Sequence, residues 1–164
     1  MPSILLVCTA NICRSPMAEA ILKRLMQKRA DASKWQIASA GTWAQPGAPP
    51  ALLSQLVVFG MGGDISAHES QLVTPELIRN YDLILTMERQ QKEGLILRFP
   101  THSNRIFMLS EMVGRVEDIP DPIIGELADY QASAQIMERF LTEGLTKIQR
   151  LARRHAAKKG ASIM

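Results

Sequence analysis

Two residues near the N-terminus, Cys8 and Arg14, have the types and the spacing needed for nucleophilic chemistry on a phosphate. Cys8 ends an apolar run, and Arg14 comes just before Ser15-Pro16, a pair typical of a helix start. Backbone N–H groups at such a strand-to-helix turn have no helical partner and, with the helix dipole, can bind an anion. A guanidinium can hold two phosphate oxygens, and the same positive field favours a cysteine thiolate, which can attack phosphorus.

The loop between these two residues is expected to bind phosphate through its backbone, as a nest of amides around a tetrahedral oxyanion. Asn11 suits such a loop because asparagine tolerates left-handed backbone angles. A Cys followed by an Arg six residues later also arises by chance, so the interpretation depends on the flanking strand and helix signals. The expected phosphate-binding residues are Thr9, Ala10, Asn11, Ile12, Cys13 and Arg14.

Strand and helix patterns alternate along the chain, which predicts a three-layer α/β/α fold with a central parallel sheet of about four strands. The apolar runs predicted to be strands are 3–7, 36–40, 82–87 and 105–109. The predicted helices begin at about residue 15, cover 51–61, 74–80 and 88–97, and end in one long helix from about 129. Gly144 weakens that last prediction. Ligands of such sheets bind at the carboxyl ends of strands, which selects 8–14, 39–41 and the loop after the fourth strand.

The composition is that of a globular protein, and its 164 residues fit one domain, 1–164. No apolar run reaches the roughly 18 residues of a membrane span, and no signal-peptide pattern is present, so we expect a cytoplasmic protein. With two cysteines and three scattered histidines, neither a disulfide scaffold nor a zinc site is expected. We therefore expect no metal and no cofactor.

The net charge of +3 comes from the C-terminal segment. Its six basic residues are Lys147, Arg150, Arg153, Arg154, Lys158 and Lys159. Removing them from the 19 basic residues leaves 13, against 16 acidic ones. We interpret the run as the solvated face and frayed end of a helix, so neither nucleic acid nor a membrane is an expected partner. The oligomeric state is left open, with a monomer as the default.

Residues 7–19, VCTANICRSPMAE, resemble the signature loop of low-molecular-weight protein tyrosine phosphatases. Four further segments match the family: Ser39-Ala40-Gly41-Thr42, Ile65-Ser66-Ala67-His68, Asp82 to Glu88, and Asp121-Pro122. The resemblance covers most of the chain. It implies hydrolysis of phosphotyrosine in a protein substrate through a phosphocysteine, with Cys8 as nucleophile, Arg14 as phosphate clamp and Asp121 as general acid. It also implies that a hydrogen-bonded network of Asn11, Ser15, Ser39 and His68 supports the loop.

Several roles stay open at the level of residues alone. Asp118 competes with Asp121 as general acid. Ser15 could cap the helix or donate a hydrogen bond to the Cys8 thiolate. Trp43 could form a wall of the pocket. Cys8 and Cys13 share a loop, and we hypothesise that Cys13 traps peroxide-oxidised Cys8 as a reversible disulfide.

The sequence departs from the family pattern at Ala10, where glycine is usual, and at Ile123-Ile124, where many members carry aromatic residues. Ile12 matches tyrosine-specific members, whereas arginine-specific ones usually have Thr, so the main alternative activity is that of a protein arginine phosphatase. An arsenate reductase would need cysteines beyond Cys13, which this chain lacks. A non-catalytic phosphate-binding module would need neither a nucleophile nor an acid.

Overall fold

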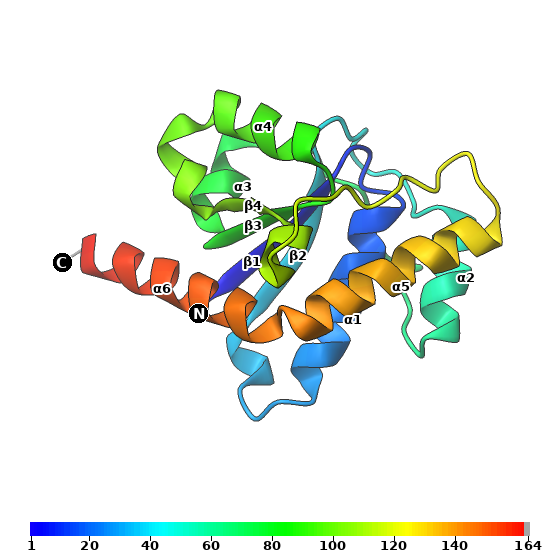
Figure 1. Cartoon of the computed structure of the whole chain (residues 1–164), viewed down its shortest axis with the longest axis horizontal. Helices are drawn as coiled ribbons and strands as arrows, with labels where there is room; N and C mark the ends of the chain where they lie inside the picture. The colour runs from blue at the N-terminus through cyan, green and yellow to red at the C-terminus, as the bar shows by residue number, and fades with distance from the viewer. Residues whose placement is uncertain (163–164) are drawn as a thin grey trace.

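A central parallel sheet, covered by helices on both faces, organises the computed structural model, which describes residues 1–162 (Figure 1). Its strands are β1 (Ser3–Cys8), β2 (Gln36–Gly41), β3 (Leu83–Thr86) and β4 (Ile106–Met108). They lie in the order β2-β1-β3-β4, all parallel. The predicted four-stranded parallel sheet is thus confirmed, each strand within one residue of its expected ends. The last two residues of the predicted domain, Ile163 and Met164, lie outside the described part.

Within residues 1–162, six α-helices and three short 3₁₀ segments accompany the strands. The helices are α1 (Arg14–Gln27), α2 (Leu52–Gly60), α3 (Pro75–Asn80), α4 (Arg89–Arg98), α5 (Leu127–Glu143) and α6 (Leu145–Ser162). The 3₁₀ segments, which were not predicted, are η1 (Ala32–Lys34), η2 (Pro100–Arg105) and η3 (Leu109–Val113).

Strand β1 shows why the fold has three layers, because its side chains are buried on both faces of the sheet. Ile4, Leu6 and Cys8 belong to a core shared with α1, α2 and α5. Leu5 and Val7 point the other way, into a smaller core with α3 and α4. A strand buried on both faces must be apolar throughout, as this one is. Its carboxyl end brings Cys8 to the edge of the sheet.

The single long helix predicted from about residue 129 is wrong, because the chain breaks at Gly144 into α5 and α6. A Cβ at Gly144 would lie 2.7 Å from the Cβ of Met112 in η3, so only glycine fits this close approach. The low helix propensity of glycine weakened the prediction of one helix, but the contact with η3 that fixes the position of the break is not visible in the local sequence.

Helix α6 carries the basic C-terminal run, and part of that run is tied to the domain. Arg153 pairs with Asp31 at 2.5 Å, and Lys159 pairs with Asp82 at 2.9 Å. His155 is buried, and its pKa is lowered by burial and by neighbouring cationic side chains, including Arg105. The run is therefore not only a solvated and frayed end. No helix within residues 1–162 has the length and apolarity needed to cross a bilayer.

Candidate active site

The loop between β1 and α1 curls at the carboxyl edge of the sheet, with Cys8 at one end and Arg14 at the other. Asn11 has φ 58° and is, among the described residues, the only non-glycine with a positive φ. Ala10 therefore has no left-handed conformation, so its departure from the family's glycine brings no strain of that kind. Within residues 1–162, no amide of residues 9–13 donates to a protein acceptor. These N–H groups remain available to an anion.

The end of β2 holds this loop in place. Thr42 donates its amide to the Cys8 carbonyl, and Trp43 donates to the Thr9 carbonyl, both at 2.9 Å. A Cβ at Gly41 would lie 2.4 Å from the Thr9 carbonyl oxygen, so the loop backbone rests directly on this glycine. The second segment predicted at the sheet edge, 39–41, is thus in contact with the first.

Ser15 does not cap the helix, contrary to one of its two predicted roles. Helix α1 already begins at Arg14, which places Ser15 inside its first turn. The Ser15 hydroxyl lies 3.0 Å from the Cys8 sulfur, and Asn11 Nδ2 donates to the Ser15 Oγ at 2.8 Å. Because the oxygen accepts from Asn11, its own proton is free to point at the sulfur. This geometry suits stabilisation of a thiolate.

The other predicted supporting residues converge on Asn11, whose side chain is fully buried. Asn11 Nδ2 also donates to Ser39 Oγ at 3.0 Å, and Asn11 Oδ1 accepts from the Gln71 amide at 2.9 Å. His68 Nε2 lies 2.9 Å from the Asn11 carbonyl oxygen and must donate to it. Ser39 in turn donates to Glu19 at 2.6 Å. The structure therefore brings together all four residues of the expected network, and adds Gln71 and Glu19.

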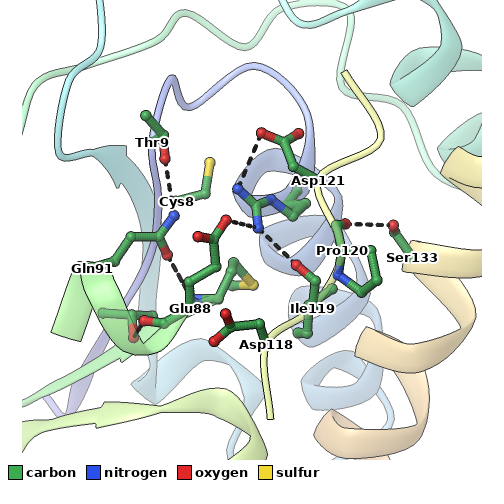
Figure 2. Close-up of polar contacts among 12 residues, drawn as sticks. Cys8, Thr9, Glu88, Gln91, Asp118, Ile119, Pro120, Asp121 and Ser133 are labelled. Atoms are coloured by element: carbon green, nitrogen blue, oxygen red, sulfur yellow. Dashed lines mark hydrogen bonds and ion pairs between the residues drawn. The ribbon is translucent and has the colours of Figure 1, made fainter. Parts of the chain in front are cut away.

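Arg14 lies almost completely buried beneath the loop, with 1% of its side chain exposed. Its guanidinium contacts Glu88 at 2.5 Å, the Ile119 carbonyl oxygen at 2.7 Å and Asp121 at 3.3 Å. These acceptor residues are labelled in Figure 2. Glu88 was missed as a site residue by sequence reasoning. Its signal was its place directly after the third predicted strand, which lies beside β1 in the sheet.

The two candidate acids, Asp118 and Asp121, are placed very differently. Asp118 Oδ1 accepts the Arg89 amide at 2.8 Å, at the start of α4. Asp121 instead faces Arg14 and is 42% exposed, so it is open to a substrate from outside. Ser133 of α5 donates to the Pro120 carbonyl at 2.9 Å and holds the loop next to Asp121 (Figure 2). The geometry favours Asp121 as the proton donor.

Cys13 is the second thiol of the loop, and it is buried against α5. Its sulfur lies 3.5 Å from the Tyr130 hydroxyl. Burial raises the pKa of the Cys13 thiol, although the Tyr130 hydroxyl opposes this. Burial likewise raises the pKa of the Tyr130 phenol. The described residues contain no cluster of three His, Cys, Asp or Glu side chains that could hold a metal ion.

Several apolar side chains in or after the predicted site segments are exposed. Trp43 is 83% exposed, and Ile124 in the loop after Asp121 is 98% exposed. Ile123 is also exposed. Ile12 is only half-buried and packs partly against the core beneath the loop.

Comparison with known proteins gives a consistent result. A family model described as low molecular weight phosphotyrosine protein phosphatase matches residues 3–155. The chain is 34% identical over 149 residues to the probable low molecular weight protein-tyrosine-phosphatase EpsP of Ralstonia nicotianae, covering 91% of this chain and 97% of the relative. It is 31% identical over 141 residues to the protein-arginine-phosphatase of Bacillus subtilis, covering 85% and 92%. The solved YwlE arginine phosphatase from Geobacillus stearothermophilus superposes with a TM-score of 0.83 at 29% identity, covering 94% of this chain and 97% of that one.

Proposed function

This chain belongs to the low-molecular-weight phosphotyrosine protein phosphatase family, and we propose that it hydrolyses phosphotyrosine in proteins through a phosphocysteine on Cys8. One observation carries the proposal. Arg14 and Asp121 are 107 positions apart, yet their side chains meet at 3.3 Å beside the loop that begins at Cys8. A nucleophile, a phosphate clamp and an acid thus share one site at the sheet edge.

In the first step the Cys8 thiolate attacks phosphorus while the ester bond to the leaving oxygen breaks. Arg14 and the amides of residues 9–13 bind the equatorial oxygens and stabilise the charge that spreads over them. Asp121, on the exposed side of the site, acts as the acid and gives a proton to the leaving phenolate oxygen. The products are a phosphocysteine and a free tyrosine hydroxyl.

In the second step water hydrolyses the phosphocysteine. The Asp121 carboxylate, deprotonated by the first step, takes a proton from the attacking water. The P–S bond breaks, inorganic phosphate leaves, and the electron pair returns to the Cys8 sulfur. A hydrogen bond from Ser15, 3.0 Å away, stabilises this thiolate leaving group. Asn11, Ser39 and His68 act by positioning the loop and Ser15.

Phosphoarginine is the alternative substrate, because relatives named for both activities resemble this chain. The half-buried Ile12 of the anion loop is apolar and offers a guanidinium no hydrogen bond, so the donors of a bound guanidinium would lose water without compensation, at about 1–3 kcal/mol. A flat aryl ring loses nothing of this kind and gains from burial. Ile123 and Ile124, which follow Asp121-Pro122, are exposed and apolar but supply no aromatic wall. We therefore assign phosphotyrosine as the preferred substrate and expect weak activity on the shorter phosphoserine.

A catalytic thiolate implies a reducing compartment, and we place the enzyme in the cytoplasm. We also propose reversible redox control. Peroxide would oxidise the Cys8 thiolate to a sulfenic acid, and the Cys13 thiol would displace water from it to form a disulfide. Cys13 shares the loop with Cys8, which supports this trapping step.

The activity is tested by hydrolysis of an aryl phosphate in the presence of EDTA. Cys8→Ser should abolish turnover but retain phosphate binding, because the anion loop and Arg14 are unchanged while the serine hydroxyl is a poor nucleophile. Arg14→Ala should lose both. Substantial activity in Cys8→Ser, or a requirement for a divalent metal, would contradict the mechanism.

Substrate choice is tested by comparing kcat/KM for matched phosphotyrosine and phosphoarginine peptides with the wild type and with Ile12→Thr. We expect the wild type to prefer phosphotyrosine and the variant to shift toward phosphoarginine. A wild-type preference for phosphoarginine would make the chain an arginine phosphatase. An unchanged ratio in the variant would show that Ile12 does not select the substrate.

A further inference from the structure

A groove of about 430 Å³ leads away from the anion loop along helix α4. It begins at Thr9 in the loop and is bordered on one side by the exposed indole of Trp43. Glu88 also borders it near the loop, but its carboxylate pairs with Arg14. The groove is therefore continuous with the proposed phosphate site, and its walls are partly apolar.

One face of α4 forms the other side of this groove, through Gln91, Gly94, Leu95 and Arg98. Their spacing of three and four residues places them in line along the helix. Gln91 is buried and donates to Thr9 Oγ1 at 3.1 Å, while its own oxygen accepts the Glu88 amide at 3.0 Å (Figure 2). This end of the helix face is thus fixed to the anion loop.

Arg98 lies at the opposite end of the same face. Its side chain is exposed, and it forms no ion pair with any residue in the described range 1–162. Gly94 lies between the two ends, and a Cβ added there would meet no atom within 4 Å. The middle of the groove is therefore open. Its far end carries a positive charge that has no acidic partner in this range, although the Arg98 guanidinium lies 5.0 Å from the centre of the Phe99 ring.

The length of this face fits a short stretch of extended peptide. Gln91 and Arg98 are seven residues apart, which is about 10 Å along a helix that rises about 1.5 Å per residue. An extended chain advances about 3.3 Å per residue. The distance from the loop to Arg98 thus corresponds to about three residues of a bound peptide.

We propose that this groove binds the substrate segment next to the phosphorylated residue, and that Arg98 recognises a carboxylate side chain about three residues away from it. The inference rests on the proposed phosphatase activity and adds to it a choice among phosphoprotein sequences. Trp43 provides a rigid amphipathic surface for the residues in between. Charge complementarity selects the acidic side chain, as at other exposed recognition sites.

The test uses phosphotyrosine peptides that differ at one position only. That position is the third before or the third after the phosphotyrosine, and it carries either Glu or Lys. The kcat/KM of the Glu peptide is compared with that of the Lys peptide on each side. At low salt we expect a preference of roughly two- to fivefold for Glu over Lys on one of the two sides, as is typical of a solvent-accessible ion pair. Salt should reduce this preference. A wild type that hydrolyses every peptide equally would overturn the subsite alone, whereas one that hydrolyses none would overturn the phosphatase assignment.

Variants locate the effect. Arg98→Ala should bring the Glu-to-Lys ratio close to one, and Arg98→Glu should invert it. Arg89→Ala is the matched control, since Arg89 lies on the same helix, nearer the loop, but does not line the groove. If Arg89→Ala reduces the Glu-to-Lys preference as much as Arg98→Ala does, the preference comes from the general positive field of the helix, and the proposal that Arg98 recognises the peptide in the groove is refuted.

A second variant tests the groove without changing charge. Gly94→Met places a side chain in open space in the helix interior, where it should also favour the helix. We expect it to reduce kcat/KM for the Glu peptide several-fold more than for free phosphotyrosine. Equal effects on both substrates would overturn the proposal that peptide occupies the groove.

Discussion

Replacement of Asn11 by alanine should destabilise the protein strongly, because two separate costs fall on one buried residue. The side chain makes three hydrogen bonds, to Ser15, Ser39 and the Gln71 amide. At about 1 kcal/mol each, their loss lowers the free energy of unfolding by about 3 kcal/mol. Alanine at φ 58° adds about 1–2 kcal/mol of backbone strain. The total of about 4–5 kcal/mol corresponds to a fall in Tm of roughly 10–20 °C.

Asn11→Gly separates the two costs. Glycine also loses the hydrogen bonds but accepts the left-handed conformation, so it should be about 1 kcal/mol more stable than the alanine variant. Urea denaturation measures the free energies of unfolding, with the exposed Asn104→Ala as a control expected to stay within about 0.5 kcal/mol of wild type. If alanine and glycine are equally stable, Asn11 carries no strain. If both match the control, the network does not hold the loop.

Three further predictions follow from the site and from α6. Asp121→Asn should lower kcat by about 10²–10⁴ for ordinary leaving groups and much less for very acidic ones, with Asp118→Asn as control; a larger loss in the control would reassign the acid. Peroxide should yield a Cys8–Cys13 disulfide that thiols reverse, detected by mass spectrometry; over-oxidised Cys8 without this bridge would refute protection by Cys13. The lowered pKa of His155 means that the unfolded chain binds a proton more readily, so stability should fall as pH drops below about 6.5. His155→Gln should flatten this dependence in thermal unfolding; an unchanged slope would exclude His155 as its source.

The sequence was sufficient to predict the sheet and the main features of the loop because these depend on local signals. Apolar runs marked the strands, and Cys8 and Arg14 are close neighbours in the chain. Glu88 was not recognised as a partner of Arg14, since that pairing depends on which strands lie side by side. The predicted roles of Cys8, Arg14 and Asp121 in the reaction remain proposals, although the structure brings the last two together.

The sequence prediction and the structure also differ at Ser15 and Gly144, where the local sequence was compatible with two structures. Ser15 beside Pro16 is a reasonable helix cap, yet the helix starts one residue earlier and the hydroxyl turns to Cys8. Gly144 in a helical pattern usually costs only about 1 kcal/mol, and the pattern alone does not require a break there. The break depends on η3, a segment some thirty residues earlier that packs against it.

The contact between Gly41 and the Thr9 carbonyl links the active site to the folding of the whole sheet. The anion loop can reach its final shape only after β2 has paired with β1, because its backbone rests on the end of that strand. A chain in which β2 is detached should therefore bind no phosphate, even with every loop residue present. Conversely, inorganic phosphate binds only the assembled loop, so it should slow hydrogen exchange in β1 and β2 as well as in the loop itself.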